Sequence, residues 1–430
     1  MQKSSDNESD LMSERMNFRD GDLSARSTAE AVARRSYGKL IAFLAARTRD
    51  VAAAEDALSE AFAAALADWP KQGCPLNPEA WLLTVARRKT IDMARRRHNR
   101  ETAAEELRIL AKGLEAAADQ EIPDQRLALL FACAHPAIEL GIRSPLMLQV
   151  VLGLDAKMVA SAFLMSPAAM GKRLVRAKEK IRQAGIPFRI PEREELPERV
   201  DAVLEAVYAA FSEGWADPEG TDAVRRDLTD EAFYLARLVT ELLPEEPEAL
   251  GLLACMLQAE ARRHARRRGD GEYVPLANQD CKLWDSQMIV EAEEILMNAN
   301  SLRRIGRYQL EGALQSAHIH RCRTGQPNWV EVVQLYDALF MITHSPVVAI
   351  NRALAIAEIN GASAGLQSMP DLEDDSRLAE YQPYWAARAE LLARNGKCGE
   401  ARNAYEIAIG LERDAAVRRF LQRRQAALAS

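Results

Sequence analysis

Apolar residues recur every three or four positions along most of this chain, a spacing typical of amphipathic helices. Polar residues, Gly and Pro interrupt the pattern at Arg49–Asp50 and between Lys71 and Pro78, which predicts that helices end there. We find no strand-rich stretch. The pattern therefore predicts an all-α protein. The clearest apolar stripe consists of Val51, Ala54, Leu58, Phe62, Ala65 and Trp69.

Composition supports helices packed on helices. Of the 430 residues, 48% are hydrophobic but only 6% are aromatic, and Ala and Leu, which favour helices, are abundant. A chain of this length is expected to form about two to four domains.

Several features indicate a cytoplasmic protein without a membrane partner. No apolar run reaches the roughly 18 residues that suggest a membrane span, and the polar N-terminus MQKSSDNESD is not a signal peptide. The six cysteines are scattered without a CxxC pair, which argues against a disulfide framework or zinc finger.

Breaks in the pattern divide the chain into segments. A polar, aperiodic stretch at the N-terminus predicts a disordered tail, and a Pro- and Glu-rich joint at 191–199 predicts a domain boundary. The expected segments are the tail at 1–27, a helical unit at 28–100, an acidic linker at 101–123, a second helical unit at 124–190 and a C-terminal helical domain at 200–430.

The C-terminal segment contains a hint of a repeat. Trp385, Gly396, Ala401, Tyr405 and Ala408 match the spacing of a tetratricopeptide repeat (TPR), a unit of two helices. The terminal Pro of such a repeat is missing, and a second helix pair near 329–359 fits the register poorly. We therefore predict an irregular, TPR-like helical solenoid.

Charge is distributed unevenly along the chain. The formal net charge is −7, but residues 30–100 carry 13 Lys and Arg against 8 Asp and Glu, and residues 155–190 carry 8 against 2. Because attraction to phosphates depends on the local patch more than on the total, two basic segments in an acidic protein still favour nucleic-acid binding.

Residues 155–183 have the pattern of a helix-turn-helix. Ser166 suits the N-cap of the second helix, and Pro167 suits its first position. Small residues near the start of that helix would let it approach a major groove, and basic residues behind them would reach phosphates or base edges. The alternative is an ordinary amphipathic helix with a solvated basic face. The predicted buried stripe is Met170, Leu174, Ala177 and Ile181, and the predicted DNA face is Ser166, Ala168, Ala169, Lys172, Arg173, Arg176 and Lys180.

Residues 77–100 combine an aromatic with a dense basic arc. Basic side chains hold a nucleic-acid backbone, and aromatic rings stack on unpaired bases, so this segment suits DNA strand separation. A core tryptophan beside a solvated face is the alternative. The candidate DNA-binding residues are Trp81, Arg87, Arg88, Lys89, Arg95, Arg96 and Arg97, with Arg100 beyond them.

An acidic ridge lies on the predicted helix at 50–70. Carboxylates and a serine stack four residues apart beside apolar residues, an arrangement that suits docking on a basic helical partner. A solvated face is the alternative. The candidate docking residues are Glu55, Asp56, Ser59, Glu60 and Phe62.

These segments resemble bacterial RNA polymerase sigma factors of the extracytoplasmic-function type, a subgroup of the sigma-70 family. AAEDALSEAFAAALADW resembles region 2.2, which implies binding to the β′ clamp helices of core polymerase. PEAWLLTVARRKTIDMARRR resembles regions 2.3 and 2.4, which implies melting and recognition of the −10 element. VLGLDAKMVASAFLMSPAAMGKRLVRAKEKIR resembles region 4, which implies recognition of the −35 element and contact with the β flap.

The resemblance extends beyond region 4. Segments such as GIPFRIP, VYAAFSEGWA and GRYQLEGAL resemble a subgroup of sigma factors with a C-terminal TPR-like domain. It implies that this domain stands in for a separate regulator and binds a protein or ligand of its own, with the sign of the regulation left open. Departures from the family pattern are Ala57 and Leu58 in region 2.2 and Gly171 in the recognition helix.

The sequence contains little that indicates an enzyme or a metal site. The sequence has no Walker A, GxGxxG or GxSxG motif, so we expect no enzyme, no catalytic residues and no cofactor. His318 and Cys322 have metal-compatible spacing, but no second cluster completes a site, and we expect no metal. Two rival functions stay open: a helix-turn-helix regulator that acts without polymerase, and a TPR-type adaptor protein.

Overall fold

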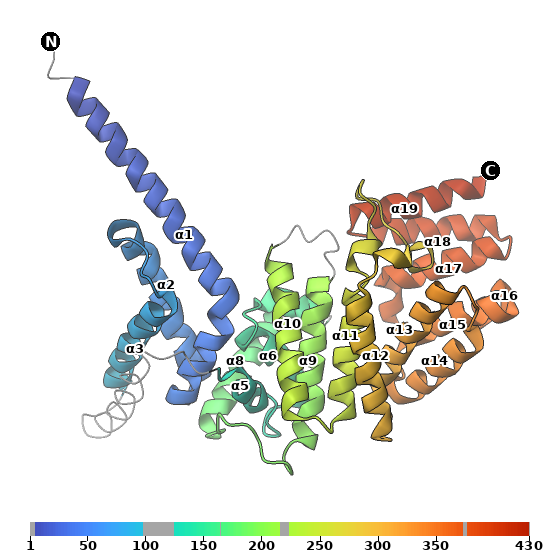
Figure 1. Ribbon diagram of the computed structural model, residues 1–430, viewed down its shortest axis with the longest axis horizontal. Coiled ribbons are helices and arrows are strands. Elements are labelled where there is room, and N and C mark those ends of the chain that lie inside the picture. Colours follow the sequence, from blue (N-terminus) through green and yellow to red (C-terminus); the bar gives the residue numbers. More distant parts are fainter. Residues whose placement is uncertain (1–4, 98–123, 164, 216–222, 373–375, 430) are drawn as a thin grey trace. The chain divides into compact units, whose positions relative to one another are not determined.

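The computed structural model describes residues 5–97, 124–163, 165–215, 223–372 and 376–429. Within these ranges every regular element is a helix, and the one backbone bridge is an isolated pair, Arg267 with Tyr273. The predicted all-α class is confirmed (Figure 1). The fold divides into two compact units. The first contains Met1–Gly214 and Asp227–Leu235, and the second contains Trp215–Arg226 and Ala236–Ser430.

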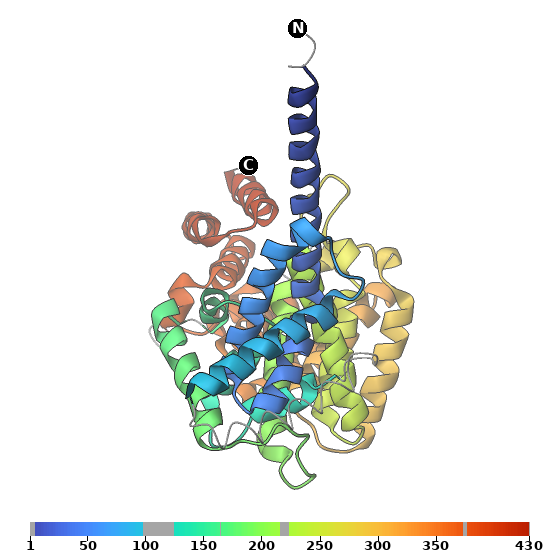
Figure 2. The same ribbon diagram turned by 90° about the vertical axis from the view of Figure 1, so that its left-hand side faces the viewer.

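The first three helices of the first unit pack on one another (Figures 1 and 2). They are α1 (Ser5–Thr48), α2 (Val51–Gln72) and α3 (Pro78–Arg97), so both predicted breaks are confirmed. Between α1 and α2, Arg49 has a positive φ of 53°, and Asp50 caps α2 by accepting from the Ala53 amide at 3.0 Å. The predicted apolar stripe is buried except for Phe62, which is half-buried.

The same unit contains a second group of helices. They are α5 (Arg126–Cys133), α6 (Leu140–Val150), α7 (Ala156–Ala162), α8 (Pro167–Gln183), α9 (Pro197–Trp215) and the part Asp227–Leu235 of α10 (Ala223–Leu242). The boundary between the compact units thus lies beyond α9, and not at the Pro- and Glu-rich joint. A Pro-rich joint shortens the connection, but it does not prevent the next helix from packing back.

Helix α1 begins at Ser5, within the segment 1–27 that we expected to be a disordered tail. The disorder of this segment stays a prediction. Adding one residue to an existing helix costs much less free energy than nucleating a new one, so a packed helix can extend through a polar stretch that has no apolar pattern. The acidic linker at 101–123 lies outside the described residues.

The second unit is a succession of helices and short 3₁₀ turns. Its α-helices after α10 are α11 (Pro247–Glu260), α12 (Ser286–Ser301), α13 (Arg307–Thr324), α14 (Trp329–Thr343), α15 (Pro346–Asn360), α16 (Ala362–Gln367), α17 (Gln382–Arg394), α18 (Cys398–Leu411) and α19 (Ala415–Ala426). Its 3₁₀ turns are η1 (Arg263–Arg266), η2 (Leu276–Asn278), η3 (Cys281–Leu283), η4 (Ser376–Glu380) and η5 (Ala427–Ala429).

The predicted repeat falls on the pair α17 and α18. Gly396 provides the positive φ of 75° at the turn between them, and Ala401, Tyr405 and Ala408 are buried in the cluster that joins α17, α18 and α19. The second predicted pair, near 329–359, corresponds to α14 and α15, which also pack together. Paired helices are therefore present at both places, and the TPR-like character stays a prediction.

Hydropathy within the described ranges identifies no helix that is both long and apolar enough to span a bilayer.

Replacing Gly38 by Ala should destabilise the first unit. Gly38 lies in α1, and a Cβ atom there would overlap the carbonyl oxygen of Val151, the residue that ends α6. A backbone atom cannot move aside cheaply. We expect a loss of about 1–3 kcal/mol in the free energy of unfolding, the usual cost of overpacking, measured by urea denaturation.

Gly171→Ala is the matched control. Gly171 also lies inside a helix, α8, but nothing stands within 4 Å of the position that its Cβ would take. The substitution there should leave stability unchanged or raise it by about 1 kcal/mol, because Ala favours helices. Equal effects at the two positions would contradict the close approach of α1 to Val151.

Candidate nucleic-acid interface

The segment predicted to be a helix-turn-helix contains the helices α7 and α8. Asp155 begins α7 by accepting from the amides of Lys157 at 2.9 Å and Met158 at 2.7 Å. Ser166 begins α8, and its Oγ accepts from the Ala169 amide at 3.3 Å. The predicted stripe of Met170, Leu174, Ala177 and Ile181 is buried. Local capping and one apolar face therefore fix the direction in which the opposite face of α8 points.

That opposite face is largely exposed. Arg173 differs from the rest, because it is half-buried and its Nη2 donates to Glu139 at 2.7 Å, while Nη1 contacts the Met165 sulfur at 3.3 Å. The Glu139 side chain is itself 72% exposed, so this ion pair contributes little stability, and a phosphate could replace the carboxylate. The residues of the predicted DNA face that are exposed are Ser166, Ala168, Ala169, Lys172, Arg176 and Lys180.

The predicted strand-separating segment lies on α3. Trp81 is half-buried and packs edge-on against the buried Trp69, with 5.5 Å between ring centroids. Arg87 is half-buried and Arg88 is exposed, whereas Lys89 donates to Glu60 at 3.0 Å. Thus part of Trp81 belongs to the core and part is accessible. Arg95, Arg96 and Arg97 lie on the last turns of the α3 backbone, and their side chains, like Arg100, lie outside the described part.

The predicted acidic ridge lies on α2. Asp56, Ser59 and Glu60 are exposed, and Phe62 is half-buried. Glu55 is different, because Lys178 of α8 donates to both of its carboxylate oxygens, at 2.6 and 2.8 Å.

The Glu55–Lys178 pair joins this ridge of α2 directly to α8. Only 18% of the Glu55 side chain and 11% of the Lys178 side chain are exposed. Burial raises the pKa of the Glu55 carboxyl, and the charge and hydrogen bonds of Lys178 partly offset this shift. Sequence analysis missed Lys178. The one signal was its place four residues after Leu174, at the edge of the apolar stripe of α8.

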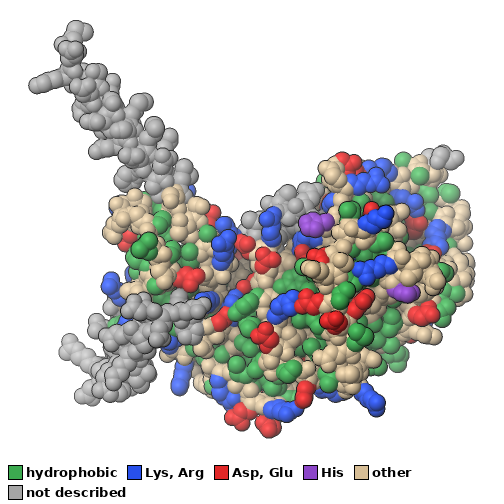
Figure 3. All heavy atoms as spheres, viewed as in Figure 1, with side chains coloured by type: hydrophobic (Ala, Val, Ile, Leu, Met, Phe, Trp, Pro, Cys, Tyr) green, Lys and Arg blue, Asp and Glu red, His purple; other side chains and the backbone are tan. Residues whose placement is uncertain are grey.

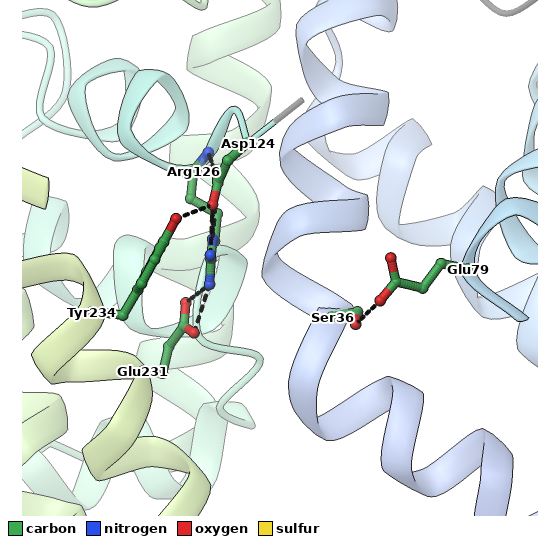
Figure 4. Close-up of polar contacts among 6 residues, drawn as sticks. All are labelled: Ser36, Glu79, Asp124, Arg126, Glu231 and Tyr234. Carbon is green, nitrogen blue, oxygen red and sulfur yellow. Dashed lines mark hydrogen bonds and ion pairs between the residues drawn. The ribbon is translucent and has the colours of Figure 1, made fainter. Parts of the chain in front are cut away.

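Arg126 is the centre of a second polar cluster (Figure 4). Its Nε donates to Asp124 at 3.0 and 3.1 Å, and its Nη1 donates to Glu231 of α10 at 2.6 Å. The guanidinium lies 4.3 Å from the centroid of the Tyr234 ring, whose hydroxyl donates to Asp124 at 2.8 Å. Burial acts to raise the pKa of Asp124, but the hydrogen bonds and charge of Arg126 hold it below its usual value.

Helix α10 also contacts α1. Asp227 accepts from Arg34 of α1 at 3.2 Å. Asp227 and Glu231 are four residues apart and therefore lie on the same face of α10. One face of this helix thus binds an arginine from each of the two helical groups of the unit. Within the first group, Ser36 of α1 donates to Glu79 of α3 (Figure 4).

Helix α9 is packed into the second group by buried polar side chains. Arg143 of α6 donates to the carbonyl oxygens of Ile138 at 3.0 Å and Glu198 at 3.1 Å. Ser144 donates to Glu205 at 2.5 Å, and Arg199 of α9 donates to the carbonyl oxygen of Phe131 at 3.4 Å. A buried polar group left without its partner costs about 1–3 kcal/mol, so removing α9 would leave α6 with uncompensated donors.

Comparison with known proteins assigns the first group of helices. A family model described as Sigma-70 region 2 matches residues 32–100, which cover the end of α1, all of α2 and all of α3. Residues 32–100 are therefore similar to region 2 of the sigma-70 family. Proteins of this family are non-catalytic transcription factors that act with RNA polymerase core and promoter DNA.

Two further comparisons extend beyond residues 32–100. Residues 199–300 match a family of unknown function, DUF6596, which begins within α9. An uncharacterized protein of Rhizobium meliloti (strain 1021) is 39% identical over 384 residues, which are 87% of this chain and 89% of the relative. No solved structure matches the chain.

Other candidate residues have structural partners. Arg321 Nη2 donates to His318 Nδ1 at 2.7 Å, and Cys322 donates to the carbonyl oxygen of Gln279 at 3.8 Å. No group of three metal-ligating side chains occurs in the part of the chain that the structure describes. On the face shown in Figure 3, Lys and Arg side chains lie among Asp and Glu side chains in both units.

Replacing Asp124 by Asn should weaken the Arg126 cluster in a pH-dependent way. Because the folded-state pKa of Asp124 is lowered, its carboxylate stabilises the fold above the unfolded pKa of about 3.9, and this stabilisation is lost as the pH falls through the folded value. We expect Asp124→Asn to cost about 1–3 kcal/mol at pH 7 and progressively less below about pH 4, measured by urea unfolding.

Glu60→Gln is the control for this experiment. Glu60 forms its ion pair with Lys89 at the surface, so its loss should cost less than about 0.5 kcal/mol. A cost for Asp124→Asn that is the same at pH 7 and pH 3.5 would show that the charge of Asp124 does not stabilise the cluster.

Proposed function

We propose that this protein is a sigma factor of the extracytoplasmic-function type that directs core RNA polymerase to specific promoters. The observation that carries the proposal is the combination, in one compact unit, of a region 2 match at 32–100 with a capped helix-turn-helix at α7–α8. A regulator that acts without polymerase needs the helix-turn-helix alone, and a TPR-type adaptor needs neither.

Each surface has a role in this proposal. The ridge of Asp56, Ser59, Glu60 and Phe62, with Glu55 when it is released from Lys178, docks on the β′ clamp helices. The accessible part of Trp81 and the basic residues of α3 melt and bind the −10 element. The exposed face of α8 enters the major groove at the −35 element, and the bundle around it binds the β flap.

We interpret the described arrangement as a closed state of such a factor, in which α2 and α8 are in contact and the two promoter elements cannot both be bound. The −10 and −35 elements are separated by about 25 base pairs, which is about 85 Å of duplex at 3.4 Å per base pair. The Glu55–Lys178 pair holds α2 and α8 in direct contact. Both elements therefore cannot be bound while this pair is intact, and promoter binding requires α8 to move away from α2.

The C-terminal part would regulate this opening through α10. The two carboxylates on one face of α10 bind Arg34 of region 2 and Arg126 at the start of region 4. Opening must break at least one of these contacts along with the Glu55–Lys178 pair. The helices after α10 form the TPR-like domain of the proposal, where a protein or ligand would act on α10.

Transcription by the full-length protein with core polymerase tests the proposed function. We expect a specific run-off product from promoter fragments that core polymerase alone does not give. Arg176→Ala should reduce initiation at −35-dependent promoters by about 5- to 150-fold, because losing one base contact costs about 1–3 kcal/mol.

Arg182→Ala is the matched control, since Arg182 lies at the end of the same helix and is paired with Glu179. It should retain wild-type activity. A wild-type protein that gives no specific product and does not bind core polymerase would refute the sigma-factor assignment. Equal activity of Arg176→Ala with and without a −35 element would remove Arg176 from the proposed interface.

If the described arrangement is a closed state, a substitution that separates α10 from α1 should increase core-polymerase binding and transcription. Asp227→Arg places a cation against Arg34 and should raise core-polymerase affinity and promoter-specific transcription several-fold. The second change Arg34→Asp should reverse the effect by restoring an ion pair of opposite polarity. If Asp227→Arg lowers both quantities and Arg34→Asp rescues them, α10 holds an active arrangement and not a closed one.

A further inference from the structure

Two half-buried cysteines, 41 positions apart in the sequence, lie together in the second unit. Cys281 is the first residue of η3, and Cys322 lies in the last turn of α13. The Cys281 thiol donates to the carbonyl oxygen of Cys322 at 3.3 Å, and the Cys322 thiol donates to the carbonyl oxygen of Gln279 at 3.8 Å. Each sulfur is therefore held against the backbone of the other segment.

Packing fixes this arrangement. Both cysteines lie at the edge of one apolar cluster, and η3 packs directly on α13. Burial and the neighbouring Cys281 thiol raise the pKa of Cys322 to about 11, so this sulfur keeps its proton at neutral pH. The cluster consists of Ala261, Ala265, Trp284, Ile289 and Ile319.

The other four cysteines have different surroundings. Cys133 and Cys255 are buried, and burial raises the pKa of each thiol. Cys74 and Cys398 are exposed. Cys281 and Cys322 thus differ from the other four in being two partly accessible cysteines held together, with the Cys281 sulfur 3.3 Å from the backbone oxygen of Cys322. Disulfide formation requires such proximity and access.

We propose that Cys281 and Cys322 form a reversible thiol–disulfide site that reacts with small-molecule disulfides. The thiolate of one cysteine attacks the oxidant, forms a mixed disulfide and releases one small thiolate. The sulfur of the other cysteine then loses its proton to solvent, attacks the protein sulfur of the mixed disulfide and expels the second small thiolate. In total two protein thiols lose two electrons, and one disulfide is reduced to two thiols.

The bond would tie η3 to the end of α13 and close a loop that contains all of α12. Such a cross-link limits the unfolded chain more than the folded one, so the oxidised second unit should be more resistant to heat. The inference is independent of the proposed sigma-factor function, because it concerns the chemistry of this unit alone.

Peptide mapping of the full-length protein tests the proposal. The reduced protein is incubated in buffers with a rising ratio of oxidised to reduced glutathione, and free thiols are then blocked and the chain is cut with trypsin without reduction. Trypsin cleaves after Arg268, Lys282, Arg321 and Arg323 and so releases peptide 269–282 and the dipeptide 322–323. If the disulfide has formed, it links these two peptides into one product. We expect this cross-linked product, its loss on adding dithiothreitol, and a higher Tm of the oxidised protein.

Variants distinguish this pair from general thiol oxidation. Cys281→Ser and Cys322→Ser should each abolish the product and the rise in Tm, while Cys74→Ser and Cys398→Ser should change neither. In the wild-type protein, free Cys281 and free Cys322 should disappear together as oxidant rises, a readout that needs no variant. Separate glutathione adducts on the two cysteines, or cross-links from either to Cys74 or Cys398, would overturn the proposal.

Discussion

The arrangement of the first unit depends on buried arginines whose partners come from distant parts of the chain. Arg126 stands at the start of α5, yet one of its carboxylates comes from α10, 105 positions away. Likewise, Arg143 of α6 donates to the carbonyl oxygen of Glu198 in α9, and Arg199 of α9 donates to the carbonyl oxygen of Phe131 in α5. A buried guanidinium without partners is costly, so these contacts make α9 and residues 227–235 of α10 part of the structural unit that contains α7 and α8.

Because α9 belongs to the first unit, the family match at 199–300 does not correspond to a separate C-terminal domain. That match begins within α9, which is hydrogen-bonded to α5 and α6, and it continues into the second unit. A cut at the Pro- and Glu-rich joint would therefore leave Arg143 and Ser144 without their partners in α9. Loss of activity in such a truncated chain would report loss of packing as readily as loss of regulation, and for this reason point substitutions on α10 are the more specific probe.

Features that depend on local chemistry could be predicted from the sequence. The ends of α2 and α3, the Ser166 cap and the buried stripe of α8 all follow from side chains within a few residues of one another. The Glu55–Lys178 pair, the Arg126–Glu231 pair and the Cys281–Cys322 contact could not be predicted. Their members are 123, 105 and 41 positions apart, and nothing in a single sequence specifies which of many charged or sulfur-bearing residues will meet.

The Glu55–Lys178 pair also limits the stability of the proposed closed state relative to the open state. A partly buried ion pair loses hydration on both sides, and part of its attraction only compensates for that loss. Separation would return Glu55 to water or to a basic partner and would leave Lys178 beside the proposed DNA face of α8, so both groups would gain new interactions on opening. The difference in free energy between the closed and the open state is then a small difference between large opposing contributions.

A regulator would need only a modest difference in affinity for the closed and the open state, of the order of a few kcal/mol, to move the population from one to the other. Helix α10 is suited to this role because Asp227 and Glu231 on its one face bind arginines on both sides of the contact that must open.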